Sequence, residues 1–110
     1  MIIIYYEVGK EPKIGIIKRD LKEMQKLVDG PIENYQVNEN ICLICNEEGY
    51  IKGLPMNRKV VDKEGIIHQA ICGNFFVCGA GKEDFISLKP DQIRKIMKYS
   101  DSGRYPAWVK

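Results

Sequence analysis

The sequence has one histidine, one tryptophan and no long apolar run. Its densest apolar stretches, Met1–Tyr6 and Ile41–Cys45, are far shorter than the ~20 residues that a membrane-spanning helix needs. The first residues also lack the basic start and apolar stretch of a signal peptide. At 45% hydrophobic residues, however, the chain can bury a core, so it does not read as a disordered protein. We therefore expect a soluble, cytoplasmic protein with no membrane partner.

The sequence also has no large excess of basic or of acidic residues. The 17 basic and 15 acidic side chains give a formal net charge of +2, and the two signs alternate in segments such as Lys18–Asp20 and Lys82–Asp84. Nucleic-acid-binding domains usually carry a clustered basic patch. The charge pattern therefore argues against nucleic acid as a partner and favours a solvated surface.

The four cysteines do not have the pattern of a disulfide framework, although two of them have the spacing of a zinc knuckle. They are Cys42, Cys45, Cys72 and Cys78, and three of them lie inside apolar, strand-like runs. A free cysteine there behaves as a small buried hydrophobe. Cys42 and Cys45 are three residues apart, so in a strand they point to opposite faces and could bind one zinc ion, with Cys72 and Cys78, only if the chain turned between them. We expect free thiols and no metal.

The 110 residues leave room for one domain, in which turn residues separate the strand-like runs. The predicted strands are 1–8, 13–18, 32–37, 41–45, 66–72 and 74–78, and the segment 50–61 is predicted to be mostly loop. Short turns can join only antiparallel neighbours, because parallel pairs need long crossovers. The prediction is an α+β fold with a mostly antiparallel sheet of about five to six strands and two helices packed on it. Residues 1–100 form this domain and residues 101–110 a C-terminal tail.

The two helices are marked by their ends. Asp20 is a good N-cap, with Glu23 three residues later, and Gly30 can take the left-handed conformation that ends a helix. Pro90 suits the first position of a second helix, because its missing N–H would be unpaired there anyway. The basic face of this helix, with Lys59 and Lys63 nearby, could contact nucleic acid, but no aromatic side chains are interleaved with it, so a solvated face is the expectation.

Four motifs follow one another between Leu27 and Met97. They are Val28–Glu33, then Asn46–Gly49 with Gly53–Arg58, then Gly73–Gly79, and last Asp84–Leu88 leading into Asp91–Ile93. In this order they resemble the domain of unknown function 3846 family, of which the second motif is the specific part. The resemblance implies an accessory protein of a phage or other mobile element, working in the cytoplasm of a bacterial host. It implies no particular activity.

The strongest candidate binding segment is Asn46–Arg58, the longest irregular stretch of the chain. It concentrates Asn46, Glu47, Glu48, Asn57 and Arg58. Loops on a rigid sheet often carry binding groups, and Arg58 suits a two-pronged hydrogen bond to a carboxylate or phosphate. The alternative is that Asn46 and Asn57 cap turns and that Arg58 pairs with Glu47 or Glu48.

The tail supplies two further candidates, Tyr105 and Trp108. Aromatic side chains are favoured anchors at protein interfaces. The tail can dock on its own domain, on a second copy of the chain or on a partner, so a homo-oligomer stays open.

Catalytic motifs are incomplete. His68 is the only histidine, so a nucleophile–base dyad with a cysteine would have to use it, but it lies in a strand-like run and suits a structural role. The segment Gly79–Lys82 lacks the first glycine and the final serine or threonine of a phosphate-binding loop.

These observations predict a non-enzymatic binding protein without a cofactor. The first hypothesis is an inhibitor that occupies a host protein, such as a defence component, through Asn46–Arg58 and the tail. The second is a sponge that sequesters a nucleotide-type signalling molecule, with Arg58 on its phosphate. The third is a small enzyme that uses His68.

Overall fold

The structure, a computed structural model, describes residues 1–110 as nine strands and two helices. The strands are β1 (Ile2–Tyr6), β2 (Lys13–Ile16), β3 (Ile32–Gln36), β4 (Ile41–Asn46), β5 (Met56–Val61), β6 (Ile67–Cys72), β7 (Phe75–Ala80), β8 (Phe85–Ile86) and β9 (Arg104–Pro106). The helices are α1 (Leu21–Val28) and α2 (Pro90–Tyr99). No helix is long and apolar enough to span a membrane.

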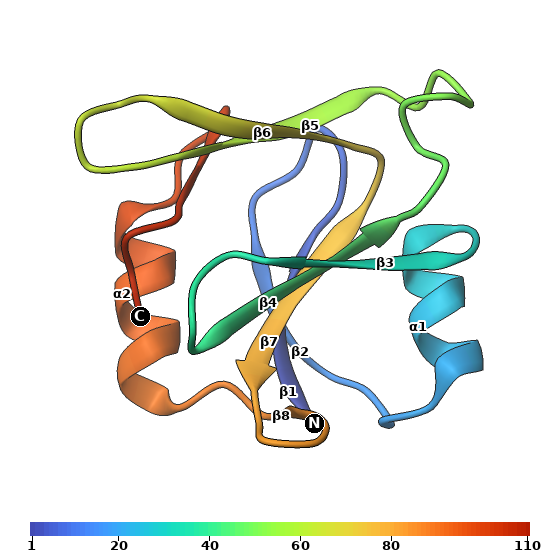
Figure 1. The fold of residues 1–110 in the computed structure, drawn as a ribbon, viewed down its shortest axis with the longest axis horizontal. Helices are drawn as coiled ribbons and strands as arrows, with labels where there is room; N and C mark the ends of the chain where they lie inside the picture. The colour runs from blue at the N-terminus through green and yellow to red at the C-terminus, as the bar shows by residue number, and fades with distance from the viewer.

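The strands form two sheets (Figure 1). The larger has six strands in the order β2-β1-β7-β4-β3, with β8 also paired to β7, and the smaller has three in the order β6-β5-β9. Every pairing is antiparallel except that of β5 with β9. The α+β class and the mostly antiparallel pairing are therefore confirmed. The division into two sheets was not predicted.

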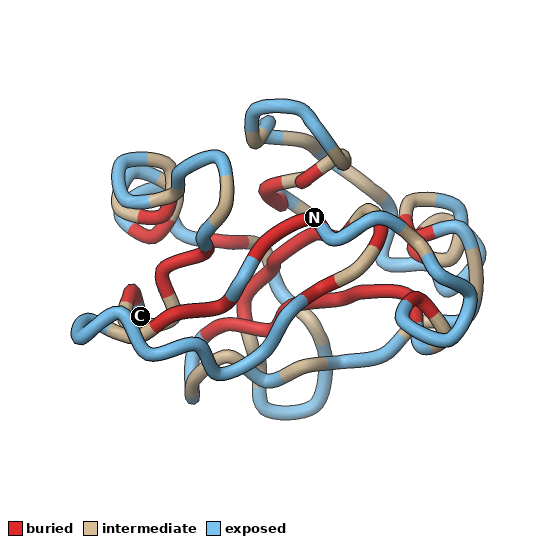
Figure 2. The backbone as a smooth tube through the Cα atoms, turned by 90° about the horizontal axis from the view of Figure 1, so that it is seen from above, coloured by how far each residue is buried: buried red, intermediate tan, exposed pale blue.

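Side-chain alternation along the central strands divides the core into two layers. In β4, Leu43 packs into one cluster and its neighbours Cys42 and Ile44 into the other, and all six residues of the strand are buried. The first cluster includes Ile96 of α2, and the second includes Met24 of α1. The larger sheet therefore has α1 on one face and α2 with the smaller sheet on the other. Figure 2 shows the buried stretches of chain in the middle of the molecule and the exposed ones around them.

Two segments differ from the prediction. Residues 56–61, predicted as loop, form β5, which begins directly after the turn around Gly53. Residues 104–106, predicted as part of a tail, form β9 beside β5, with Tyr105 and Val109 in the core. The parallel pairing was not foreseen because its partners are far apart in the chain.

The predicted start of α1 is correct, and its predicted end is off by one residue. Asp20 caps the helix, its Oδ1 accepting a hydrogen bond from the Lys22 N–H at 2.9 Å. The left-handed residue at the C-terminal end is Asp29, with φ 60°, and not Gly30. Aspartate tolerates this conformation better than most residues do.

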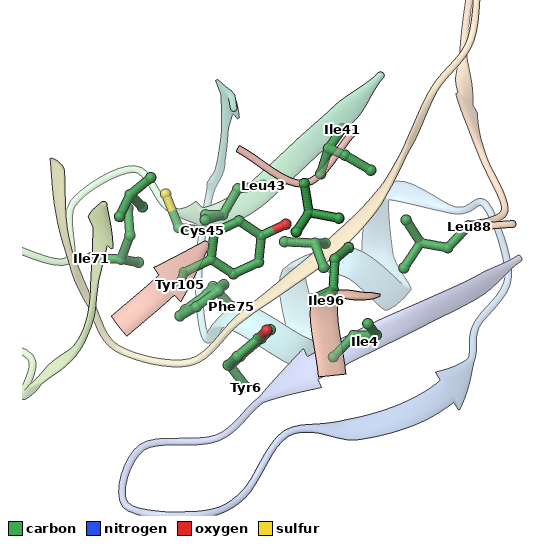
Figure 3. Packing of buried hydrophobic residues seen from close by; sticks show 13 residues of the cluster. Ile4, Tyr6, Ile41, Leu43, Cys45, Ile71, Phe75, Leu88, Ile96 and Tyr105 are labelled. Carbon is green, nitrogen blue, oxygen red and sulfur yellow. The ribbon is translucent and has the colours of Figure 1, made fainter. Parts of the chain in front are cut away.

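A group of aromatic rings joins the two sheets (Figure 3). The ring of Tyr6 in β1 stacks on Phe75 of β7, with centroids 4.5 Å apart, and meets the edge of Tyr105 of β9 at 5.8 Å. The Tyr6 hydroxyl lies 2.6 Å from the Ser100 Oγ, whereas the buried Tyr105 hydroxyl has no hydrogen-bond partner. Burial raises the pKa of both phenols, so both stay protonated.

These two hydroxyls allow a matched test of the packing. Tyr105→Phe removes a buried polar group without a partner, so we expect the free energy of unfolding to stay the same or to rise by up to ~1 kcal/mol. Tyr6→Phe removes a hydrogen bond and should lower the free energy of unfolding by about 1 kcal/mol. Urea unfolding measures both changes. A larger loss in Tyr105→Phe than in Tyr6→Phe would contradict the packing described here.

Candidate functional site

Asn46 has a structural role at the end of α1. Its Nδ2 donates hydrogen bonds to the carbonyl oxygens of Val28 and Asp29 at 3.0 and 3.1 Å. Its Oδ1 accepts a hydrogen bond from the Glu48 N–H at 2.7 Å. The side chain is buried, so it caps the last turn of the helix and fixes the next turn of the chain.

Asn57 is also buried and connects the two sheets. Its Nδ2 donates to the carbonyl oxygens of Tyr6 and Gly73 at 3.0 and 2.9 Å, and its Oδ1 accepts a hydrogen bond from Arg58 Nη1 at 2.8 Å. The register of β5 against β6 shifts between Met56 and Arg58, and both Asn57 and Arg58 are buried at this irregularity. The binding role predicted for Asn57 is therefore corrected to a structural one.

Arg58 does not pair with Glu47 or Glu48, so that part of the alternative interpretation is wrong. Its side chain is buried, its Nη2 donates to the Lys10 carbonyl oxygen at 3.1 Å, and its guanidinium carbon lies 5.4 Å from the centroid of the Tyr6 ring. The residue faces inward from β5 and away from the loop before that strand. It therefore cannot bind a ligand together with the two glutamates.

The two glutamates lie on the exposed part of the predicted segment. Glu48 pairs with Lys52 at 3.7 Å, and Glu47 forms no ion pair. The loop that follows them presents two large hydrophobic side chains, Tyr50 and Ile51, which are 87% and 84% exposed. This loop is therefore the part of Asn46–Arg58 that a partner can reach.

The tail residues separate into a core residue and a surface residue. Tyr105 is fully buried, so it is not available as the interface anchor that the sequence predicted. Trp108 is partly buried and meets Tyr99 of α2 edge-on, with ring centroids 4.5 Å apart. The ammonium group of Lys63 lies 5.4 Å above the Trp108 ring, and that of Lys98 lies 5.2 Å above the Tyr99 ring.

Around these rings lies a cleft of about 350 Å³, called the Trp108 cleft below. Its lining residues come from the β5–β6 turn, from α2 and from the chain after β9, and these segments lie on one side of the molecule in Figure 1. They are Lys63, Arg94, Lys95, Lys98, Tyr99, Trp108, Val109 and Lys110. Five of the eight are cationic and two are aromatic.

Three of the five cations form ion pairs with carboxylates, and two do not. Asp91 pairs with Arg94 at 2.6 Å and with Lys95 at 3.2 Å, and Glu39 pairs with Lys110 at 3.6 Å. Hydrogen bonds from Arg94 and Lys95 hold the pKa of the Asp91 carboxyl below its usual value. The remaining two cations, Lys63 and Lys98, have no ion pair in the structure, so the cleft carries unbalanced positive charge.

The sequence contains only a weak signal for this cleft. Tyr99 follows Lys95 by four residues, so the two side chains lie on one face of α2. Trp108, however, reaches that face only because β9 pairs with β5. An aromatic side chain therefore does accompany the basic face of the helix, contrary to the sequence-based expectation.

Cys42 and Cys78 are cross-strand partners in β4 and β7, whereas Cys45 and the histidine lie elsewhere. Cys42 and Cys78 face one core cluster and Cys45 the other, and burial raises the pKa of the Cys45 and Cys78 thiols to about 12. No group of three or more histidine, cysteine, aspartate and glutamate side chains is placed to hold a metal ion. The Nε2 of His68 lies 2.8 Å from Asp62 Oδ2 on the exposed β5–β6 hairpin. His68 lines no cavity.

The family model for the domain of unknown function DUF3846 matches residues 1–101 of the chain. This protein belongs to the DUF3846 family. No curated protein and no solved structure matches this DUF3846 chain. Of the residues that line the Trp108 cleft, those from the β5–β6 turn and α2 lie inside the matched region, and Trp108, Val109 and Lys110 lie beyond it.

A matched pair of variants tests the structural role of Asn46. Asn46→Ala leaves two carbonyl groups and one N–H without their partner, so we expect the free energy of unfolding to fall by roughly 1–3 kcal/mol. Glu47→Gln alters an exposed, unpaired carboxylate and should change it by less than ~0.5 kcal/mol. Chemical unfolding monitored by circular dichroism measures both. Equal losses in the two variants would show that Asn46 is not the buried cap described above.

Proposed function

We propose that this DUF3846 protein is a non-enzymatic binding protein that holds a nucleotide-type anion in the Trp108 cleft. The observation that carries the proposal is the set of five cations around two aromatic rings in a single concave site of about 350 Å³. Cavities of roughly 300–1,000 Å³ are typical of small-molecule sites.

The cations match the phosphate part of such a ligand. Lys63 and Lys98 have no carboxylate partner, so a phosphate can gain charge-assisted hydrogen bonds from them without displacing an ion pair. Arg94 and Lys95 share one carboxylate, Asp91, which leaves donor capacity on both. Because the site is open to solvent, binding should weaken as the salt concentration rises.

The aromatic pair matches the base part of the ligand. A nucleobase stacked on an aromatic side chain contributes about 1–3 kcal/mol to binding. To expose the face of the Trp108 ring, the Lys63 ammonium must move aside, which costs only about 0.5–1 kcal/mol at an exposed site. The displaced ammonium then stays close enough to meet the phosphate.

The composition of the cleft supports binding without a reaction. Its lining residues include no histidine, cysteine, aspartate or glutamate, which are among the most common general bases and nucleophiles in enzymes. His68 is bonded to Asp62 on an exposed hairpin, away from any cavity. A protein that sequesters a signalling nucleotide suits the accessory role in a phage or mobile element that the family resemblance implies.

The single tryptophan makes this proposal directly testable, because Trp108 is the only source of indole fluorescence. Titration with ATP and with cyclic dinucleotides should quench or shift that emission. Lys63→Gln and Lys98→Gln should each weaken binding about threefold to tenfold, because each removes one phosphate contact. The matched control is Lys22→Gln on α1, which removes an exposed lysine that has no ion pair.

Two results would count against the nucleotide proposal. One is an emission spectrum that no nucleotide changes. The other is an affinity that falls equally in Lys22→Gln and Lys98→Gln, which would indicate attraction by the overall charge alone.

A second candidate function, inhibition of a host protein, is favoured by the loop after Glu48. Tyr50 and Ile51 are almost fully exposed there, and large exposed hydrophobic side chains often mark protein interfaces. Such a partner would be a host component, for example one of its defences. No residue of this loop lines the Trp108 cleft, so the two surfaces can be tested separately.

A double substitution tests this candidate. Tyr50→Ser with Ile51→Ser should leave the free energy of unfolding within ~0.5 kcal/mol, because both side chains are exposed. It should reduce co-purification of one defined host protein about tenfold or more, because it removes both anchors. Lys98→Gln serves as the control and should retain that partner. Unchanged co-purification by the double variant would refute the role of the loop.

A further inference from the structure

Arg58 is a buried cation without a carboxylate partner. Its relative exposure is 3%, and no ion pair in the structure includes it. Buried charges in proteins are normally paired, because removing a charge from water costs several kcal/mol. Arginine also cannot escape this cost by losing its proton. The carbonyl oxygens and the Tyr6 ring around Arg58 offset only part of it.

The hydrogen bonds of Arg58 leave one edge of its guanidinium group incomplete. Nη1 donates to the carbonyl oxygen and to the Oδ1 of Asn57 at 3.1 and 2.8 Å, and Nη2 donates to the Lys10 carbonyl oxygen at 3.1 Å. Nε is buried and has no partner, and Nη2 makes one of the two bonds it can make. Nε and Nη2 form the edge that grips the two oxygens of a carboxylate or phosphate.

Arg58 also lines a small cavity of about 200 Å³. The other lining residues are Gly9, Lys10 and Glu11 from the β1–β2 turn and Ser102 from the loop between α2 and β9, so no lining residue is hydrophobic. The Gly9 N–H and the Ser102 hydroxyl form no hydrogen bond within the chain. A polar cavity of this size has room for an ion of four or five heavy atoms.

We propose that this cavity binds a small oxyanion, a phosphate or a carboxylate, beside the guanidinium group of Arg58. The anion supplies the missing counter-charge and acceptor, and Ser102 and Gly9 offer further donors. This site shares no residue with the Trp108 cleft, so it does not depend on the function proposed above.

A substitution of Glu11 distinguishes binding of a free anion at Arg58 from pairing of Arg58 with Glu11 of the same chain. Its carboxylate is the one acidic group that lines the cavity, it is exposed, and it forms no ion pair. If a free anion binds at Arg58, Glu11 repels it, and Glu11→Gln should tighten binding. If Glu11 itself closes onto Arg58 in solution, Glu11→Gln should instead destabilise the protein and added phosphate should have no effect.

The test measures the thermal unfolding midpoint of the full chain in phosphate, acetate or chloride at equal ionic strength. Ligand that binds only the native state raises this midpoint. We expect millimolar phosphate or acetate, relative to chloride, to raise it by about 2–4 °C in the unaltered protein and by more in Glu11→Gln. Comparison of the phosphate and acetate arms identifies which oxyanion the site prefers.

Further variants show which site causes the anion-dependent shift of the unfolding midpoint. Arg58→Gln should abolish the anion-dependent shift, and if it does not fold, Ser102→Ala should reduce the shift by about half. Lys98→Gln alters the Trp108 cleft and should keep the full anion-dependent shift of the midpoint. If Lys98→Gln loses that shift, the anion binds in the Trp108 cleft and not at Arg58. Equal midpoints in all three salts, or an anion-dependent shift no larger in Glu11→Gln than in the unaltered protein, would overturn the proposal.

Discussion

The attachment of the three-stranded sheet to the six-stranded sheet is the constraint on which the rest of the molecule depends. Asn57 holds it through hydrogen bonds to the Tyr6 and Gly73 carbonyl oxygens, and the Tyr6 ring packs against Tyr105 of β9. Because β9 is fixed beside β5, the chain that follows it returns over α2 and places Trp108 against Tyr99. The main candidate binding site is therefore a product of how the two sheets pack.

Local features of the sequence predicted the parts of the fold that are set locally. Asp20 and Pro90 mark the starts of both helices, and the apolar alternation of Ile41–Cys45 predicts a strand whose cysteines face opposite layers, as they do. The pairing of β5 with β9 was not predictable, because it joins Lys59 to Arg104 across most of the second half of the chain. Without knowledge of that pairing, the sequence does not distinguish Tyr105, which is a core residue, from Trp108, which lines the cleft.

The predicted binding segment shows the same limit of sequence reasoning. Asn46, Asn57 and Arg58 are polar residues among turn residues, a pattern typical of an exposed loop. In the structure they are buried because each satisfies backbone carbonyl groups that packing has removed from water. The exposed surface that the pattern indicated begins at Glu47 and includes the loop around Tyr50 and Ile51. Arg58 keeps a role in anion binding in our account, but at the β1–β2 turn and without the glutamates.

The most direct measurement for the central claim is a map of backbone amide chemical shifts as a nucleotide is added. The account predicts that the changes concentrate at Lys63, along α2 near Lys98 and Tyr99, and at Trp108, three segments that only the packed sheets bring together. Changes confined to the loop from Asn46 to Gly53, with Trp108 unaffected, would contradict it.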